Sequence, residues 1–139
     1  MKLLKYPLLL LILLNSCVRT LDEETKVVFN IPSLIGKNID EILKQLGEPD
    51  ERLHIDPNDS VAYYQFTRES WLLSVKYNPK SRKVIDFSIW HLPIVKIIQL
   101  KDLLRIGNVD SVAFGYVVIP ENLSETENGY TNITVVPRF

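Results

Sequence analysis

The sequence predicts an α+β protein in which a short amphipathic helix packs on an antiparallel three-stranded meander, extended by a second helix and short C-terminal strands. Two observations predict this class. One is a helical pattern over residues 34–50 that carries its own start and stop signals. The other is a change after residue 60, where apolar residues begin to alternate with polar ones, as in strands. The 139 residues are enough for one compact domain.

The first helix is predicted from its ends as much as from its stripe. Asn38 is a suitable N-cap, and Glu41, three residues on, completes a capping box. Gly47 followed by Pro49 ends the helix. The apolar stripe consists of Ile39, Ile42, Leu43 and Leu46.

Residues 1–16 are predicted to be a lipoprotein signal peptide. Lys2 and Lys5 precede an apolar run over residues 8–14, which is too short to cross a bilayer. Cys17, the single cysteine, follows Leu14-Asn15-Ser16, which resembles the lipobox of bacterial lipoproteins. This resemblance implies that Cys17 becomes the mature N-terminus and carries several acyl chains, palmitate among them, that anchor it in a membrane. The alternative is an ordinary signal peptide that contains a cysteine.

The remaining chain divides into residues 17–26, which are the lipidated Cys17 and a polar tether over 18–26, and a single domain over residues 27–139. Removal of residues 1–16 takes away two lysines and no acidic residue, which leaves 14 basic and 17 acidic side chains, a net charge of −3. This balance argues against a nucleic-acid-binding protein, which needs clustered basic residues. The lipobox implies a bacterial cell envelope location, anchored by lipid in the outer membrane and facing the periplasm.

Residues 53–60 are predicted to be a loop rich in Asp, Asn and Pro, and three strands follow it at 61–66, 71–77 and 84–90. Short links make the strands antiparallel. One side of the second strand carries Trp71, Leu73, Val75 and Tyr77. The two faces of the third strand are predicted to be Ile85, Phe87 and Ile89 on one side, and Val84, Asp86, Ser88 and Trp90 on the other.

A second helix is predicted from Ile97, Leu100, Leu103 and Leu104, ending at Gly107. Its beginning is open, because residues 94–98 suit an extended segment equally well. Two short strands are expected at 116–119 and 131–136. Residues 101–110 resemble 40–50, which either a duplicated unit or chance similarity between two amphipathic helices explains.

The sequence shows no arrangement typical of an active site or a metal centre. His54 and His91 are far apart, and neither has a second His or a Cys at ligand spacing. Asp86, Ser88 and His91 have the residue types of a catalytic triad, but ordinary strand patterning produces their spacing. A calcium loop over residues 56–59 lacks its turn glycine and closing Glu. We therefore expect no enzyme, no cofactor and no metal.

Aromatic side chains on the meander are the candidate partner-binding residues. A sheet covered by one small helix cannot bury both faces, so an exposed aromatic patch would bind a protein partner. The alternative is that the second half of the chain covers that face and the aromatic residues are core. The candidates are Tyr63, Tyr64, Phe66, Trp71 and Trp90.

Residues 35–90 resemble the SmpA/OmlA (BamE-like) lipoprotein domain. The resemblance rests on the lipobox, the helix 36–50 ending in Leu46-Gly47-Glu48-Pro49, and the aromatic run Tyr63-Tyr64-Gln65-Phe66. Members of that family support assembly of outer-membrane barrels. This chain departs from them because no paired helix precedes Gly36 and because further elements follow Trp90.

Two functions follow as expectations. The first is a non-catalytic, periplasm-facing lipoprotein that acts as a protein-binding or envelope-assembly module. The alternative is a periplasmic enzyme inhibitor or immunity-type protein, in which an acidic loop over residues 50–59 enters an enzyme's cleft.

Overall fold

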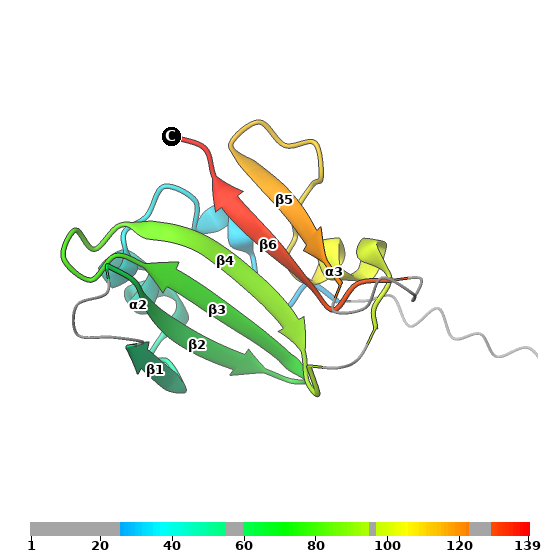
Figure 1. Ribbon diagram of the computed structural model, residues 1–139, viewed down its shortest axis with the longest axis horizontal. Coiled ribbons are helices and arrows are strands. Elements are labelled where there is room, and N and C mark those ends of the chain that lie inside the picture. Colours follow the sequence, from blue (N-terminus) through cyan, green and yellow to red (C-terminus); the bar gives the residue numbers. More distant parts are fainter. Residues whose placement is uncertain (1–25, 55–59, 95–96, 123–128) are drawn as a thin grey trace, which may run out of the picture.

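The described residues form one six-stranded antiparallel sheet with their helices on a single face. The computed structural model describes residues 26–54, 60–94, 97–122 and 129–139. The strand order is β1-β2-β3-β4-β6-β5 (Figure 1). The strands are β1 (Glu51–His54), β2 (Ala62–Arg68), β3 (Trp71–Tyr77), β4 (Val84–His91), β5 (Tyr116–Glu121) and β6 (Asn132–Pro137). The helices are the 3₁₀ turn η1 (Ile31–Ser33), α2 (Ile39–Leu46) and α3 (Leu100–Ile106).

The predicted fold class, a short helix packed on a three-stranded meander with appended C-terminal strands, is wrong. The C-terminal strands belong to the same sheet, because β6 pairs with β4 from Phe87 opposite Val135 to Trp90 opposite Asn132. At the other edge, residues 51–54 form β1 and pair with β2, although they were predicted to lie in or beside a loop. Polar residues such as Glu51 and Arg52 are tolerated there because an edge strand leaves one side to solvent.

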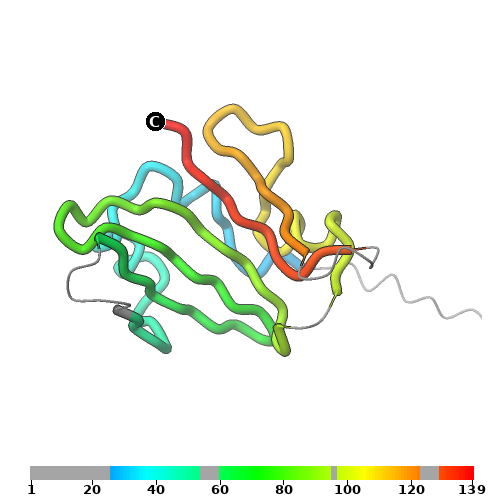
Figure 2. Tube along the Cα trace, viewed as in Figure 1, coloured from blue at the N-terminus to red at the C-terminus, as the bar shows by residue number. Residues whose placement is uncertain are grey.

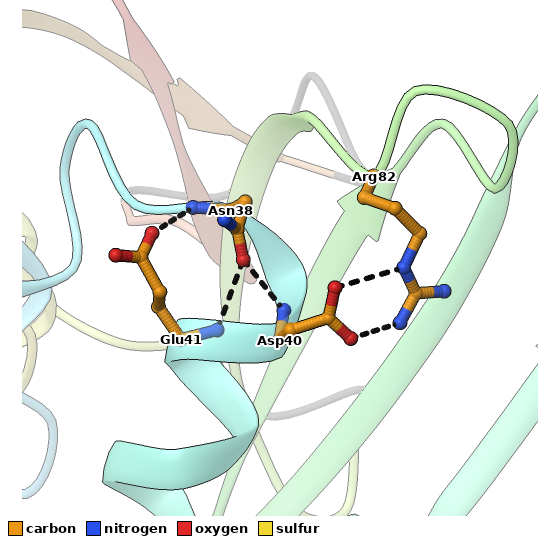
Figure 3. A network of polar contacts seen from close by, with 4 residues as sticks. All are labelled: Asn38, Asp40, Glu41 and Arg82. Carbon is orange, nitrogen blue, oxygen red and sulfur yellow. Dashed lines mark hydrogen bonds and ion pairs between the residues drawn. The ribbon is translucent and has the colours of Figure 1, made fainter.

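Helix α2 begins and ends where the sequence predicts. The Asn38 side chain accepts hydrogen bonds from the backbone N–H groups of Asp40 and Glu41, both at 3.0 Å, and the Glu41 carboxylate accepts from the Asn38 N–H at 2.9 Å (Figure 3). Gly47, with φ +92°, closes the helix by donating to the Leu43 carbonyl at 2.8 Å. The predicted capping box and glycine stop are both confirmed.

An ion pair fixes α2 to the turn between β3 and β4. The Arg82 guanidinium donates to both oxygens of the Asp40 carboxylate (Figure 3). This hydrogen bonding lowers the pKa of Asp40 below its usual value. The Ile39 N–H also donates to the Arg82 carbonyl at 3.0 Å, so backbone and side chain hold the helix start against the sheet.

Helix α3 has the shorter of the two extents that the sequence pattern left open. Ile98 is extended and forms a bridge with Tyr130, so the helix begins at Leu100 and ends before Gly107. The backbone N–H groups of Val28 and Phe29 donate to the Ile106 carbonyl at 3.0 and 2.9 Å. The N-terminal segment of the domain therefore lies against the end of α3.

The core lies between one face of the sheet and a layer made by residues 28–34, α2 and α3. This layer lies behind the strands in Figures 1 and 2. The side chains of Phe29, Leu73 and Phe87 are fully buried in it. Burial also raises the pKa of Tyr77 to about 12, and a hydrogen bond with Tyr64 adds to the effect. The helices thus cover one face of the sheet, which we name the closed face, and leave the other as the open face.

Strand β4 has a bulge that the alternation of residues could not show. Lys76 lies opposite Asp86 but Tyr77 lies opposite Val84, so Ile85 is an extra residue on β4. Val84 consequently points to the core, as Phe87 does, and its predicted position on the other face is wrong.

Three sequence predictions fall outside the described residues. They are the signal peptide with Cys17 and most of the tether, residues 55–59 of the acidic loop predicted over 50–59, and the calcium-like residues among them. Across residues 26–54, 60–94, 97–122 and 129–139, no helix is long and apolar enough to span a membrane.

Candidate functional site

The open face is organised in rows of side chains that run across the strands. Antiparallel pairing aligns every second residue of each strand with its neighbours, so residues in register form a row. The central row consists of small or polar residues, namely Gln65, Ser74, Ser88 and Thr134. One flanking row consists of Leu53, Tyr63, Lys76 and Asp86. The other consists of Leu72, Trp90, Asn132 and Glu121.

This arrangement produces a hollow across the sheet, which we name the trough. Its floor is the central row, where serine and threonine side chains are short. Its walls are the side chains of the two flanking rows other than Asn132, together with Ile94 after β4, and its volume is about 480 Å³. That volume falls within the range of ligand-binding clefts.

An ion pair lies in one wall of the trough. The Lys76 ammonium lies 3.7 Å from the Asp86 carboxylate and 5.9 Å from the centre of the Tyr63 ring. The Asp86 side chain is only 16% exposed, and this burial raises its pKa, although the charge of Lys76 acts in the opposite direction. The negative charge of Glu121 raises the pKa of Asp86 further. The surroundings of Asp86 therefore destabilise the ionised form of its carboxyl group.

The floor and the opposite wall are joined by a chain of hydrogen bonds. The hydroxyl groups of Ser88 and Thr134 are 3.0 Å apart. The Glu121 carboxylate accepts from the Asn132 amide at 2.8 Å and from the Thr134 hydroxyl at 3.3 Å. These contacts fix the polar groups of three strands before any ligand arrives, which lowers the entropy cost of binding.

The five aromatic residues predicted to bind a partner are divided between the two faces. Tyr64 and Phe66 are buried in the core, where Tyr64 packs on Tyr77 with ring centres 4.8 Å apart. Trp71 also points to the closed face and packs against the core. Tyr63 and Trp90 are half-buried on the open face and form opposite walls of the trough. Only these two are placed to meet a partner.

Side chains with catalytic potential are separated by the same alternation. Asp86 and Ser88 point to the open face, whereas His91 packs edge-on against Trp71 with ring centres 4.8 Å apart. The hydroxyl that Ser88 contacts belongs to Thr134, which is not a general base. No group of three or more His, Cys, Asp or Glu side chains that could hold a metal ion occurs in the part of the chain that the structure describes.

Comparison of the chain with protein-family models, curated proteins and solved structures gives no match. The resemblance to the SmpA/OmlA domain stays a prediction, and the trough has to be interpreted from its own chemistry.

The sequence did contain a signal for the trough. Ser74, Ser88 and Thr134 interrupt three strands that are otherwise rich in large residues, and each is flanked by core residues. What sequence reasoning missed is that register aligns these three positions, and that Lys76, Asp86 and Glu121 stand around them.

Proposed function

We propose that this chain is a non-catalytic, lipid-anchored protein of the bacterial cell envelope that binds a polypeptide partner in the trough. The lipobox-like sequence before Cys17 supports an anchor that faces the periplasm. The observation that carries the binding role is the trough itself, in which Tyr63 and Trp90 form walls above a hydrogen-bonding floor.

The composition of the trough fits a protein partner. Tyrosine and tryptophan are enriched among the residues that dominate the free energy of binding in protein interfaces, because they bury a large area around one polar group. Leu53, Leu72 and Ile94 add apolar surface to the walls. The hydroxyl floor gives the backbone amides of a polypeptide groups with which to form hydrogen bonds. A bound segment running across the strands would contact all of these rows.

The resemblance to the SmpA/OmlA domain makes components of outer-membrane barrel assembly the first partners to look for. Anchoring by acyl chains on Cys17 would hold the domain close to the membrane in which such components lie. The tether over residues 18–26 would let the open face reach them, since nine extended residues span roughly 30 Å.

The test is crosslinking of the full chain in native envelopes, followed by purification and identification of the proteins recovered. Wild type is compared with Tyr63→Ala/Trp90→Ala, which removes both aromatic walls, and with Phe139→Ala, which removes an aromatic residue that is 95% exposed outside the trough. We expect recovery of the partner to fall at least about tenfold in the double variant and to be unchanged in Phe139→Ala.

Three other outcomes would contradict parts of this proposal. Equal recovery from the double variant would exclude the trough. Recovery of a soluble periplasmic hydrolase would point to an inhibitor. An unchanged membrane fraction in Cys17→Ser, together with a wild-type N-terminus whose mass includes no acyl chains, would exclude the lipid anchor.

A further inference from the structure

The outer edge of β5 is a second interaction surface, separate from the trough. The strand order ends at β5, so this edge has no neighbouring strand among the described residues. The Arg138 N–H donates to the Gly115 carbonyl at 3.0 Å, which fixes the hydrogen-bond phase of the β5–β6 pair. Odd-numbered residues of β5 therefore bond to β6, and the N–H and C=O groups of Tyr116 and Val118 point outward.

This edge lacks most of the features that protect edge strands from pairing. Natural edges are usually shortened, bulged or charged. Residues 116–120 carry no charge, and Val117 and Ile119 are 37% and 45% exposed on the open face. Pro120 removes one outward N–H group, which limits the edge but leaves its carbonyl available.

We propose that the β5 edge pairs with the β5 edge of a second copy of this chain, antiparallel and centred on Val118, to form a continuous twelve-stranded sheet. In this register Val118 exchanges two backbone hydrogen bonds with its equivalent. Tyr116 lies opposite Pro120 of the second copy, and each Tyr116 N–H donates to a Pro120 carbonyl. The missing N–H of Pro120 therefore costs one bond at each end of the pair.

The side chains on this edge complement themselves. Val117 lies opposite Ile119 of the second copy, so each exposed apolar residue meets another and a four-residue apolar cluster closes the seam. The two Val117–Ile119 pairs together raise the association constant by up to about thirtyfold. A two-fold axis requires that one surface complement itself in this way.

Charge complementarity also favours a second copy. Glu121 lies opposite Gly115 of the second copy, and the N–H group of the exposed Arg138 donates to the carbonyl of that glycine. Gly115 has nothing within 4 Å of the position of a Cβ, so the arginine side chain has free space to extend toward the carboxylate. The pairing thus places one acidic and one basic residue near each other at each end of the seam, while the Glu121 carboxylate keeps its hydrogen bonds to Asn132 and Thr134.

The deciding experiment is sedimentation velocity of the full chain in detergent, at several protein concentrations. Val118→Pro removes the outward N–H group of residue 118, whereas the hydrogen bonds from β5 to β6 come from the odd-numbered residues and are kept. The Val118 side chain also packs against the core, so the variant's fold is checked beside its mass. Val118→Thr is the matched control, since it keeps both the N–H group and the β-branched shape. We expect wild type and Val118→Thr to dimerise, and the dissociation constant of Val118→Pro to be at least about tenfold higher.

A second variant and a crosslink test the dimer independently, in case Val118→Pro misfolds. Arg138→Glu, at an exposed position, should raise the dissociation constant about threefold by placing like charges together. A photoreactive side chain at Ile119 should give a product of twice the chain mass, and one at Glu51 on the other sheet edge should not. A wild-type monomer at all concentrations, a dimer unaffected by Val118→Pro, or an Ile119 crosslink only to a protein of another mass would each overturn the proposal. These readouts measure mass, so they are independent of whether the trough binds a partner.

Discussion

The closed and open faces of the sheet are made by the same strands but carry different kinds of side chain. Along β3 and β4, alternate residues such as Leu73 and Phe87 are fully buried beneath the helices. Their neighbours Ser74 and Ser88 form the floor of a hollow about 480 Å³ in size. The side chains of the closed face are large and apolar, and they bury much apolar surface area. The open face keeps short polar residues in the middle of the sheet, where larger apolar ones would bury more area.

This difference shows which face was shaped for stability. Burial of large apolar side chains supplies most of the free energy of folding, so the closed face suffices to hold the sheet. The open face instead carries an ion pair and a hydrogen-bonded hydroxyl row, which contribute little net stability. A function explains why the open face keeps polar residues that add little stability, and we propose that this function is binding in the trough.

The largest expected contrast is between Phe87→Ala and Trp90→Ala. Phe87 is fully buried, so its truncation should lower the free energy of unfolding by about 3–5 kcal/mol. Trp90, half-buried on the open face three residues away, should cost less than about 2 kcal/mol. Urea denaturation of both variants measures the difference. Equal losses of unfolding free energy would mean that the open face is a second core, and would contradict the proposal that it binds a partner.

The contribution of helix α2 to the stability of the closed face can be tested at its N-cap, Asn38. Asn38→Ala removes the acceptor for two N–H groups at the start of α2 and should lower the free energy of unfolding by about 1 kcal/mol. Lys44→Ala, an exposed position on the same helix, is the control and should stay within about 0.5 kcal/mol. A cap variant as stable as the control would contradict the role of Asn38.

The hydroxyl floor of the open face should give a smaller effect. Ser88→Ala breaks the 3.0 Å contact with Thr134 and should cost about 0.5–1 kcal/mol. A double-mutant cycle with Thr134→Val isolates the interaction between the two side chains. Additive losses would show that the two hydroxyl groups are not coupled and that the floor is not preorganised.

Local signals in the sequence predicted single elements well and their assembly poorly. The cap at Asn38 and the stop at Gly47 are interactions between near neighbours, so the pattern alone locates α2. Alternation of residues likewise indicates β2 and β3. The position of β6 beside β4 depends on residues more than forty positions apart, which no local pattern specifies.

The same limit explains the mixed outcome for the aromatic residues. Alternation correctly separates Tyr63 from Tyr64, but it does not state which of the two faces the helices cover. Only packing decides that Tyr64 and Phe66 are core while Tyr63 and Trp90 line the trough. The bulge at Ile85 shifts the alternation within one strand, so Val84 was placed on the wrong face.

The smallest expected effect, and the one most specific to the open face, is the pH dependence that Asp86 contributes. Burial raises its folded-state pKa above the ordinary value of about 3.9, so the folded protein binds a proton at Asp86 more readily than the unfolded chain does. The contribution of Asp86 to stability is therefore present below pH 3.9 and is lost as the pH rises through the raised pKa. Lys76 and Glu121 act on this carboxylate in opposite directions, so the comparison should be made at constant ionic strength.

Asp86→Asn removes this titration. The melting temperature of wild type, minus that of Asp86→Asn, should fall as the pH rises from 3.5 to 6, values chosen to bracket the ordinary Asp pKa. Asp40 is the control on the other side of the sheet, because its pKa is lowered by Arg82. Wild type minus Asp40→Asn should rise with pH and level off above the ordinary pKa. The two carboxylates would then report opposite slopes from the two faces of one sheet, and parallel slopes would show that Asp86 is not buried in the trough wall.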